Sequence, residues 1–463
     1  METEMKPLKL NVKRTIVIGF AFFGILMLWQ VYNTYCPLFL TEILTKKYGG
    51  ADTEYQWVVG VLMALDNLFA LFMLPLFGAW SDKTNTKFGK RMPFIVIGTA
   101  LSAIVFPLIV VMFVIRSLAG VIVMMCLTLV FMQMYRNPAV ALMPDITPKP
   151  LRSKANALIN VVGYVGAILG GALALIIPFK THMNNAGALL VPFLVCCVSM
   201  LVTIAVLFFK VKENKIAAEM VEEMKRGEEE SELQEQVVEN KPLSKKNKIC
   251  LIIMIVAVFL WFASFNAVET FWSTYGLKHL EIKNFSIFTI VLTVASLASF
   301  VPAAYISDKI GRKWTIVIGL GLMILGLMLI SFIQKSPDKF TEIADDGSVV
   351  VYHKTPWVLY PFFAICGIGW AFINCCSYPM FVELASGSNV GKYTGFYYAA
   401  SMLAQTLTPV CAGLLILQAK QWDILFVYST IVMAVALIVF VFVDNVKTKN
   451  VKIKKGLEAL DQD

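Results

Sequence analysis

Charged side chains are scarce in this chain of 463 residues. Asp, Glu, Lys and Arg make up 15% of the sequence, whereas hydrophobic residues make up 58% and the mean hydropathy is +0.73. A soluble core of this length could not hide so many apolar side chains, so the surplus must face lipid. The composition therefore predicts an integral membrane protein.

Sequence patterns for catalysis and metal binding are missing as well. The sequence contains no nucleotide-binding loop, no HExxH pattern and no nucleophile elbow. All nine cysteines fall in or at the edges of apolar runs, without the spacing of a metal site or a disulfide framework, which favours a role in helix packing. We therefore expect a protein that is not an enzyme and that needs no cofactor and no resident metal.

Twelve apolar runs are long enough to cross a bilayer core of about 30 Å as helices. They form two groups of six, which predicts an all-α fold with twelve transmembrane helices in two pseudo-symmetric six-helix bundles. The expected spans are 15–40, 57–80, 94–114, 118–143, 155–179, 188–209, 249–275, 285–305, 314–333, 357–382, 393–418 and 424–443.

The charge distribution divides the chain into four expected parts. Residues 1–209 form the N-terminal bundle and residues 249–443 the C-terminal bundle. Residues 210–248 are rich in charge and nearly free of aromatic side chains, which predicts a cytoplasmic linker with one amphipathic turn near 216–224. Residues 444–463 are expected to be a cytoplasmic tail.

The basic residues predict the orientation in the membrane. Most of the 40 Lys and Arg residues fall on one side of the expected helices, so we expect both termini to be cytoplasmic. The net charge of +9 then reflects membrane orientation and attraction to anionic lipid, and not nucleic-acid binding. Residues 334–356 lie outside in this topology, where we expect a mobile surface loop. The small loops and the lack of an organellar targeting segment favour a bacterial inner membrane.

A charged turn occurs twice, each time before the apolar tetrapeptide IVIG. The first copy spans residues 78–91 and the second spans residues 306–313. Such a repeat predicts that one half of the chain duplicates the other, as in transporters with alternating access. Charged residues of these turns and of two helix ends are expected to form an inner gate, with simple anchoring at the membrane surface as the alternative. The gate candidates are Asp82, Arg91, Asp145, Asp308, Arg312 and Glu383.

The duplicated turn resembles the signature of the major facilitator superfamily. The longer form at residues 74–95, together with residues 138–145, is similar to the glycoside–pentoside–hexuronide cation symporters, particularly their sucrose/proton symporter branch. The resemblance implies the major facilitator fold and a monomeric secondary active transporter, working as a proton-coupled symporter of a glycoside or disaccharide. Because the specific match lies in gating segments and not in the pocket, an exporter or a transporter of another small solute on the same fold is the alternative.

Two departures from this family bear on the mechanism. Sucrose symporters carry an arginine at the position that matches Val140, whereas here Arg136 lies one helical turn earlier. Sodium symporters of the melibiose type carry paired aspartates that match Ala70 and Leu74. The loss of that pair favours a proton as the co-transported cation.

Ionisable side chains inside the expected spans are functional candidates, because a charge in the hydrocarbon region is costly. Asp66 and Glu269 are the candidate proton carriers, since a carboxyl group favours its neutral form in a dry site and loses its proton when the site hydrates. A structural carboxylate bonded to a neighbouring helix is the alternative for each. Arg136 either pairs with one of these acids or donates a fork of hydrogen bonds to substrate oxygens.

Amide and aromatic side chains on several expected spans are suited to sugars. Planar polar groups bind hydroxyls, and aromatic faces cover the apolar face of a sugar ring. The alternatives are aromatic anchoring at the membrane interface and amide bridges between helices. The candidate substrate-binding residues are Gln30, Asn33, Gln133, Arg136, Asn137, Asn160, Trp272, Trp370, Asn374 and Tyr378.

Overall fold

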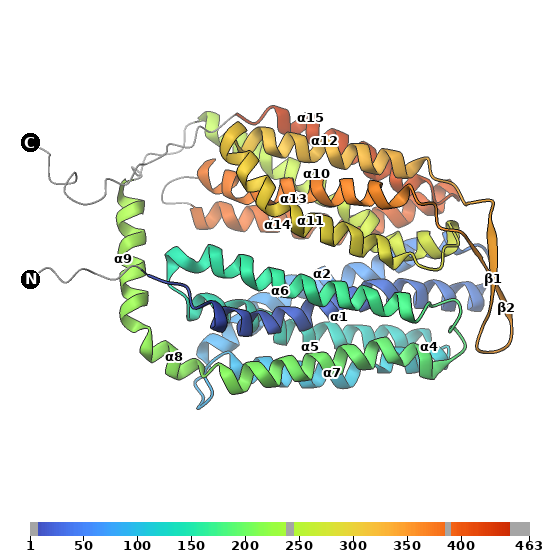
Figure 1. Cartoon of the computed structure of the whole chain (residues 1–463), viewed down its shortest axis with the longest axis horizontal. Helices are drawn as coiled ribbons and strands as arrows, with labels where there is room; N and C mark the ends of the chain where they lie inside the picture. Colours follow the sequence, from blue (N-terminus) through green and yellow to red (C-terminus); the bar gives the residue numbers. More distant parts are fainter. Residues whose placement is uncertain (1–7, 238–244, 385–389, 445–463) are drawn as a thin grey trace, which may run out of the picture.

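The computed structural model describes residues 8–237, 245–384 and 390–444. Within this part of the chain, twelve helical segments are long and apolar enough to cross a membrane. Long helices run side by side along one common direction (Figure 1). The expected all-α architecture of twelve spans is confirmed.

Seven helices build the first six spans, because the third span is divided near Pro107, which cannot donate a backbone hydrogen bond. The neighbouring 3₁₀ turns are η1 (Asp52–Tyr55) and η2 (Lys149–Leu151). The helices are α1 (Val12–Tyr48), α2 (Gln56–Lys83), α3 (Met92–Val105), α4 (Leu108–Val114), α5 (Leu118–Asp145), α6 (Arg152–Ile176) and α7 (Ala186–Lys210).

Six further helices build the second group of spans, and the first of them continues into a π-helical turn, η3 (Tyr275–His279). These helices are α10 (Lys245–Thr274), α11 (Ser286–Ile310), α12 (Arg312–Ser331), α13 (Leu359–Leu384), α14 (Val390–Ala419) and α15 (Ile424–Val441).

The two groups share one packing pattern. In the first bundle α1 packs against α6 and α7, and α3 packs against α5 and α7. In the second bundle α10 packs against α14 and α15, and α12 packs against α13 and α15. These contacts involve corresponding spans in each half, so the two bundles repeat one arrangement of six spans, as the duplicated turn predicts.

Residues 334–356 do not form the expected mobile loop. They contain a β-hairpin of two antiparallel strands, β1 (Lys339–Ile343) and β2 (Val349–His353), paired in register from Lys339 opposite His353. The hairpin stands at one end of the helices (Figure 1), which we call the hairpin end.

The hairpin is ordered by contacts with the loop between α6 and α7. The side-chain oxygen of Thr181 lies 2.9 Å from the hydroxyl oxygen of Tyr352. Nδ1 of His182 and Nδ2 of Asn185 each lie 2.7 Å from Oδ2 of Asp345. These hydrogen bonds lower the pKa of Asp345 and keep it ionised. Since the hairpin belongs to the second half of the chain, it fastens the two bundles together at this end.

The charged linker also departs from the prediction of a single amphipathic turn. Its described residues before position 238 form two helices, α8 (Glu213–Glu219) and α9 (Val221–Val237), at the opposite end of the molecule, which we call the linker end (Figure 1). The carboxylate of Glu213 is buried and accepts backbone N–H groups of Lys90 at 3.0 Å, Arg91 at 3.0 Å and Met92 at 3.2 Å. Because these donors lie at the start of α3 and lack partners within that helix, Glu213 caps it.

Glycines allow α2 and α14 to touch, but only toward the hairpin end. A Cβ on Gly60 would lie 2.1 Å from the carbonyl oxygen of Pro409, and one on Gly413 would lie 2.5 Å from a carbonyl oxygen of α2. At the linker end of the same two helices, a Cβ on Gly78 or Gly395 would meet no atom within 4 Å. Along this pair of helices the backbones are therefore in contact at the hairpin end, whereas Gly78 and Gly395 face open space at the linker end.

The close crossing predicts that Gly60 cannot be enlarged. Gly60→Leu should cost about 1–3 kcal/mol or more through overpacking and lower the Tm of the detergent-purified protein. Gly321→Leu is the matched control, because a Cβ on Gly321 meets no atom within 4 Å and this variant should melt like the wild type. Equal melting of the two variants would contradict the crossing.

The cap on α3 predicts a second effect on stability. Glu213→Ala leaves several backbone donors without their acceptor and should destabilise the protein by about 1–3 kcal/mol. Glu222→Ala, on the exposed side of α9, should change stability by less than about 0.5 kcal/mol. Thermal unfolding of both variants measures the difference, and an unaffected Glu213→Ala protein would argue against the cap.

Candidate functional site

A cavity of about 100 Å³ lies between the two bundles. The first bundle contributes α1 to its wall, and the second contributes α10, α11 and α13. Amide, hydroxyl and carboxyl groups form one part of the lining, and aromatic rings form another. The polar lining residues are Gln30, Asn33, Thr34, Glu269, Ser273, Ser286, Thr289 and Thr293.

Hydrogen bonds cross the cavity wall from one bundle to the other. The amide nitrogen of Gln30 donates to the hydroxyl of Thr289 at 3.3 Å, and the hydroxyl of Ser273 donates to the carbonyl oxygen of Asn33 at 3.5 Å. Farther toward the hairpin end, Nζ of Lys278 lies 2.8 Å from the carboxylate of Glu42. The side of the cavity toward the hairpin is therefore closed by polar contacts between α1 and the second bundle.

Two of the predicted aromatic residues lie beside the cavity. Trp272 lines it but is only 2% exposed, and its indole N–H donates to the carbonyl oxygen of Phe285 at 3.0 Å. Trp370 stacks on Phe265, another lining residue, with ring centroids 3.9 Å apart. Trp272 is therefore part of the aromatic wall, mainly as a packed and anchored side chain, whereas Trp370 does not line the cavity and supports the wall through its stacking on Phe265.

The other candidates on α13 have neighbours of their own. The amide nitrogen of Asn374 donates to the carbonyl oxygen of Trp370 within the same helix, at 2.9 Å. The ring of Tyr378 lies 5.6 Å from that of Tyr397 and 5.8 Å from that of Tyr398, nearer the linker end. Neither Asn374 nor Tyr378 lines the cavity in this conformation.

Asp66 lies within electrostatic reach of two ionisable side chains from other helices. Asp66 on α2 interacts with Arg136 on α5 and with Glu269 on α10. Within the described residues, none of the three makes a hydrogen bond or an ion pair through its side chain. Of the two alternatives for Arg136, direct pairing with a carboxylate is not made in this conformation, and its hydrogen-bond fork is available to another acceptor.

Buried polar side chains lie near Arg136 on α5 and on α1 of the first bundle. Gln133 is fully buried, and neither polar atom of its amide has a hydrogen-bond partner in the described structure. The hydroxyl of Tyr32 is also buried and also lacks a partner there. Asn137 donates to the carbonyl oxygen of Met73 on α2 at 3.3 Å. Buried polar groups without partners cost about 1–3 kcal/mol each, so Gln133 and Tyr32 mark a polar region built for something other than packing.

Some candidates lie outside the cavity, and some lining residues escaped prediction. Asn160 is partly exposed on α6 and does not line the cavity. Three hydroxyl residues on α11 do line it, namely Ser286, Thr289 and Thr293. Their spacing of three and four residues places them on one helix face, and this pattern could have identified them from the sequence.

The six gate candidates separate into two groups at the linker end. Arg91 is buried, with Nε 2.8 Å from Oδ2 of Asp145, and it also pairs with Asp82. Burial would lower the pKa of Arg91, but the carboxylates of Asp145 and Asp82 raise it.

In the second group, only two of the three gate candidates form an ion pair among the described residues. Nη2 of Arg312 lies 2.8 Å from the carboxylate of Glu383, whereas Asp308 is exposed and belongs to none of the ion pairs among described residues. Each of these ion pairs joins two residues of the same bundle. It therefore connects a charged turn to a helix of its own half.

Comparison with known proteins identifies the fold. A sequence model described as the Major Facilitator Superfamily matches residues 18–377 and 284–460. The chain belongs to the major facilitator superfamily. It is therefore a secondary transporter that moves a small molecule across a membrane, and not an enzyme. No curated protein matches the chain by sequence.

Solved structures of the superfamily agree with the fold over nearly the whole chain. The nucleoside transporter NupG gives a TM-score of 0.60 at 12% identity, covering 95% of this chain and 100% of that one. A bacterial homologue of the human drug peptide transporters gives 0.63 at 14%, covering 94% and 98%. A bacterial homologue of the iron transporter ferroportin, in an inward-facing state, gives 0.62 at 13%, covering 94% and 99%. At these identities the likeness is one of fold.

The free fork of Arg136 predicts a specific sensitivity. For a solute that raises the Tm of the purified transporter, Arg136→Lys should weaken binding about tenfold, because it keeps the charge but loses the paired donors. Titration of the thermal shift measures the affinity. Unchanged affinity in a variant that melts normally without solute would exclude Arg136 from the binding site.

Proposed function

We propose that this transporter is a proton-coupled sugar symporter that carries a glycoside or disaccharide by alternating access. The cavity between the bundles is the observation that carries the proposal, because amides, hydroxyls and aromatic rings line it together with one carboxylate, Glu269. This is the chemistry that a polyhydroxylated ring needs. The resemblance of residues 74–95 and 138–145 to the sucrose/proton branch of the glycoside–pentoside–hexuronide symporters supports the same substrate class.

In this proposal the substrate lies between α1 and the second bundle and extends toward Arg136. Gln30 and Asn33 bind hydroxyls from one side, and Trp272 provides an aromatic wall to which Trp370 contributes by stacking on Phe265. The remaining candidates contact the substrate at other stages of the cycle, when the bundles have moved. These are Gln133, Asn137, Asn160, Asn374 and Tyr378.

Asp66 and Glu269 carry the coupling in this proposal. An ionised Asp66 attracts Arg136, and a protonated Asp66 no longer does so. Proton binding therefore leaves the Arg136 fork to substrate oxygens, and proton loss draws it back. The two ligands then favour the same conformation, which is the requirement for symport.

The proposal also includes an orientation and a stage of the cycle. The linker end is cytoplasmic, with both termini inside, in a bacterial inner membrane, and the functional unit is a monomer. Because α2 and α14 touch at the hairpin end, while Gly78 and Gly395 face open space at the linker end, we assign this conformation to the inward-facing stage. The six charged gate candidates act at the inner side. The chain is divided into the first bundle, the linker, the second bundle and the tail at 209/210, 248/249 and 443/444.

A transporter or exporter of another small solute is the second candidate, and one observation favours it. The cavity combines a single carboxylate, Glu269, with the rings of Phe265 and Phe363. A carboxylate beside aromatic faces also suits an organic cation. Uptake of labelled disaccharides into vesicles under a pH gradient, compared with accumulation in the opposite direction and with a labelled organic amine, distinguishes these functions.

The coupling role predicts the behaviour of Asp66→Asn. The variant cannot exchange a proton at this position, so uphill uptake driven by a pH gradient should be lost, while exchange of substrate across the membrane should persist. Asp338→Asn, at the exposed base of the hairpin, is the control and should transport normally. Uphill uptake at the wild-type rate in Asp66→Asn would remove this residue from the coupling mechanism.

A further inference from the structure

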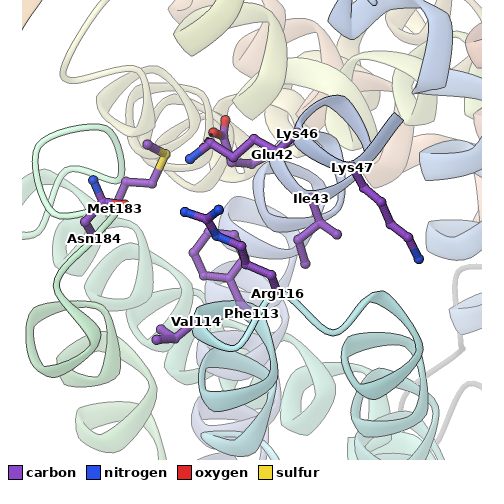
Figure 2. Close-up of a pocket in the computed structure, with 9 residues that line it drawn as sticks. All are labelled: Glu42, Ile43, Lys46, Lys47, Phe113, Val114, Arg116, Met183 and Asn184. Carbon is purple, nitrogen blue, oxygen red and sulfur yellow. Dashed lines mark ion pairs between the residues drawn. The ribbon is translucent and has the colours of Figure 1, made fainter. Parts of the chain in front are cut away.

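A second pocket, of about 470 Å³, opens at the hairpin end of the first bundle (Figure 2). Its lining comes from the last turns of α1, from the end of α4 and the turn before α5, and from the loop between α6 and α7. No residue is shared between this pocket and the cavity between the bundles. The two spaces are therefore separate in this conformation.

Basic side chains outnumber acidic ones in this pocket. Lys46, Lys47 and Arg116 line it, against a single acid, Glu42. The carboxylate of Glu42 is already held by two amines, Nζ of Lys46 at 3.0 Å and Nζ of Lys278 at 2.8 Å. The acid is thus neutralised by existing partners, and the pocket keeps a net positive charge.

Arg116 and Lys47 are the basic lining residues that form no ion pair among the described residues. The guanidinium of Arg116 points into the space between α1 and the loop that carries Met183 and Asn184, whereas Lys47 points away from this space (Figure 2). Among the described residues, no side chain forms a hydrogen bond or an ion pair with that guanidinium. A planar fork of N–H donors in a concave, positive pocket is suited to a phosphate group, which it can bind through two parallel hydrogen bonds.

Apart from Asn184, the rest of the pocket lining is apolar and continues onto an exposed apolar surface. Ile43, Phe113 and Met183 belong to its lining, and Val114 beside them is 39% exposed. The next residue, Ile115, is 62% exposed. These residues lie at the ends of spanning helices, where the headgroups of a bilayer meet its acyl chains. A ligand with a phosphate at one end and hydrocarbon at the other matches both parts.

We propose that this pocket binds the headgroup of an acidic phospholipid from the membrane leaflet at the hairpin end. Arg116 binds the phosphate oxygens, Lys46 adds a second positive charge, and the apolar residues receive the first part of the acyl chains. A free phosphate compound offers the same anion but nothing for the apolar surface. Because Lys46 also binds Glu42, which binds Lys278 of the second bundle, a lipid at this site touches the contact between the bundles.

Competition for lipid in nanodiscs tests the proposal. The full-length transporter is placed in nanodiscs of phosphatidylcholine with a minor fraction of spin-labelled phosphatidylglycerol, and the immobilised fraction is measured. Arg116→Gln and Lys46→Gln should each weaken the preference for phosphatidylglycerol about tenfold at the site. Lys420→Gln is the matched control, because Lys420 is an exposed cation at the hairpin end of the second bundle, and this variant should behave like the wild type.

The same experiment separates the sources of the anion. Millimolar glycerol 3-phosphate or inorganic phosphate should displace little labelled lipid if the apolar surface contributes to binding. Full displacement by either compound would overturn the lipid assignment. Arg116→Gln and Lys46→Gln proteins that melt normally in pure phosphatidylcholine and retain the wild-type preference for phosphatidylglycerol would overturn the site itself.

Discussion

Lipid offers no hydrogen bonds to a polypeptide backbone, and this constraint determines most of the architecture. Each apolar run must satisfy its own N–H and C=O groups, which leaves the helix as the structure for all twelve spans. The unpaired groups at helix ends are then satisfied where polar partners exist, as when Glu213 accepts the donors at the start of α3. The hairpin, whose strand edges carry unpaired backbone groups, lies beyond the spans for the same reason, whereas the linker helices lie there because they are rich in charge (Figure 1).

Two bundles built in this way can move against each other only if they are in contact at some places and free of contact at others. Gly60 and Gly413 bring α2 and α14 into backbone contact toward the hairpin end, while Gly78 and Gly395 face open space at the linker end. Polar contacts of the hairpin with Thr181 add to the closed end. In contrast, each ion pair of the charged turns joins residues of the same bundle, so it moves together with that bundle.

The candidate site depends on charged side chains that lie near one another without forming a direct ion pair. Asp66, Arg136 and Glu269 come from three helices and interact electrostatically, yet none is neutralised by a direct ion pair among the described residues. A closed ion pair would hold one state too firmly to respond to a proton or a substrate. The separation leaves the balance between states within reach of the binding free energy of a small ligand.

The sequence alone determined the twelve spans, the internal repeat and the superfamily, because span length, hydropathy and the charged turns are local properties. It also indicated Asp66, Arg136 and Glu269, since any charge in an apolar run stands out. It did not indicate the hairpin or the helical linker, although Asp346-Gly347 between β-branched runs is a turn signal. Only the tertiary structure decided that the hairpin and the linker are folded, which groups surround each charge, and which candidates line the cavity. These features depend on contacts between residues far apart in the chain.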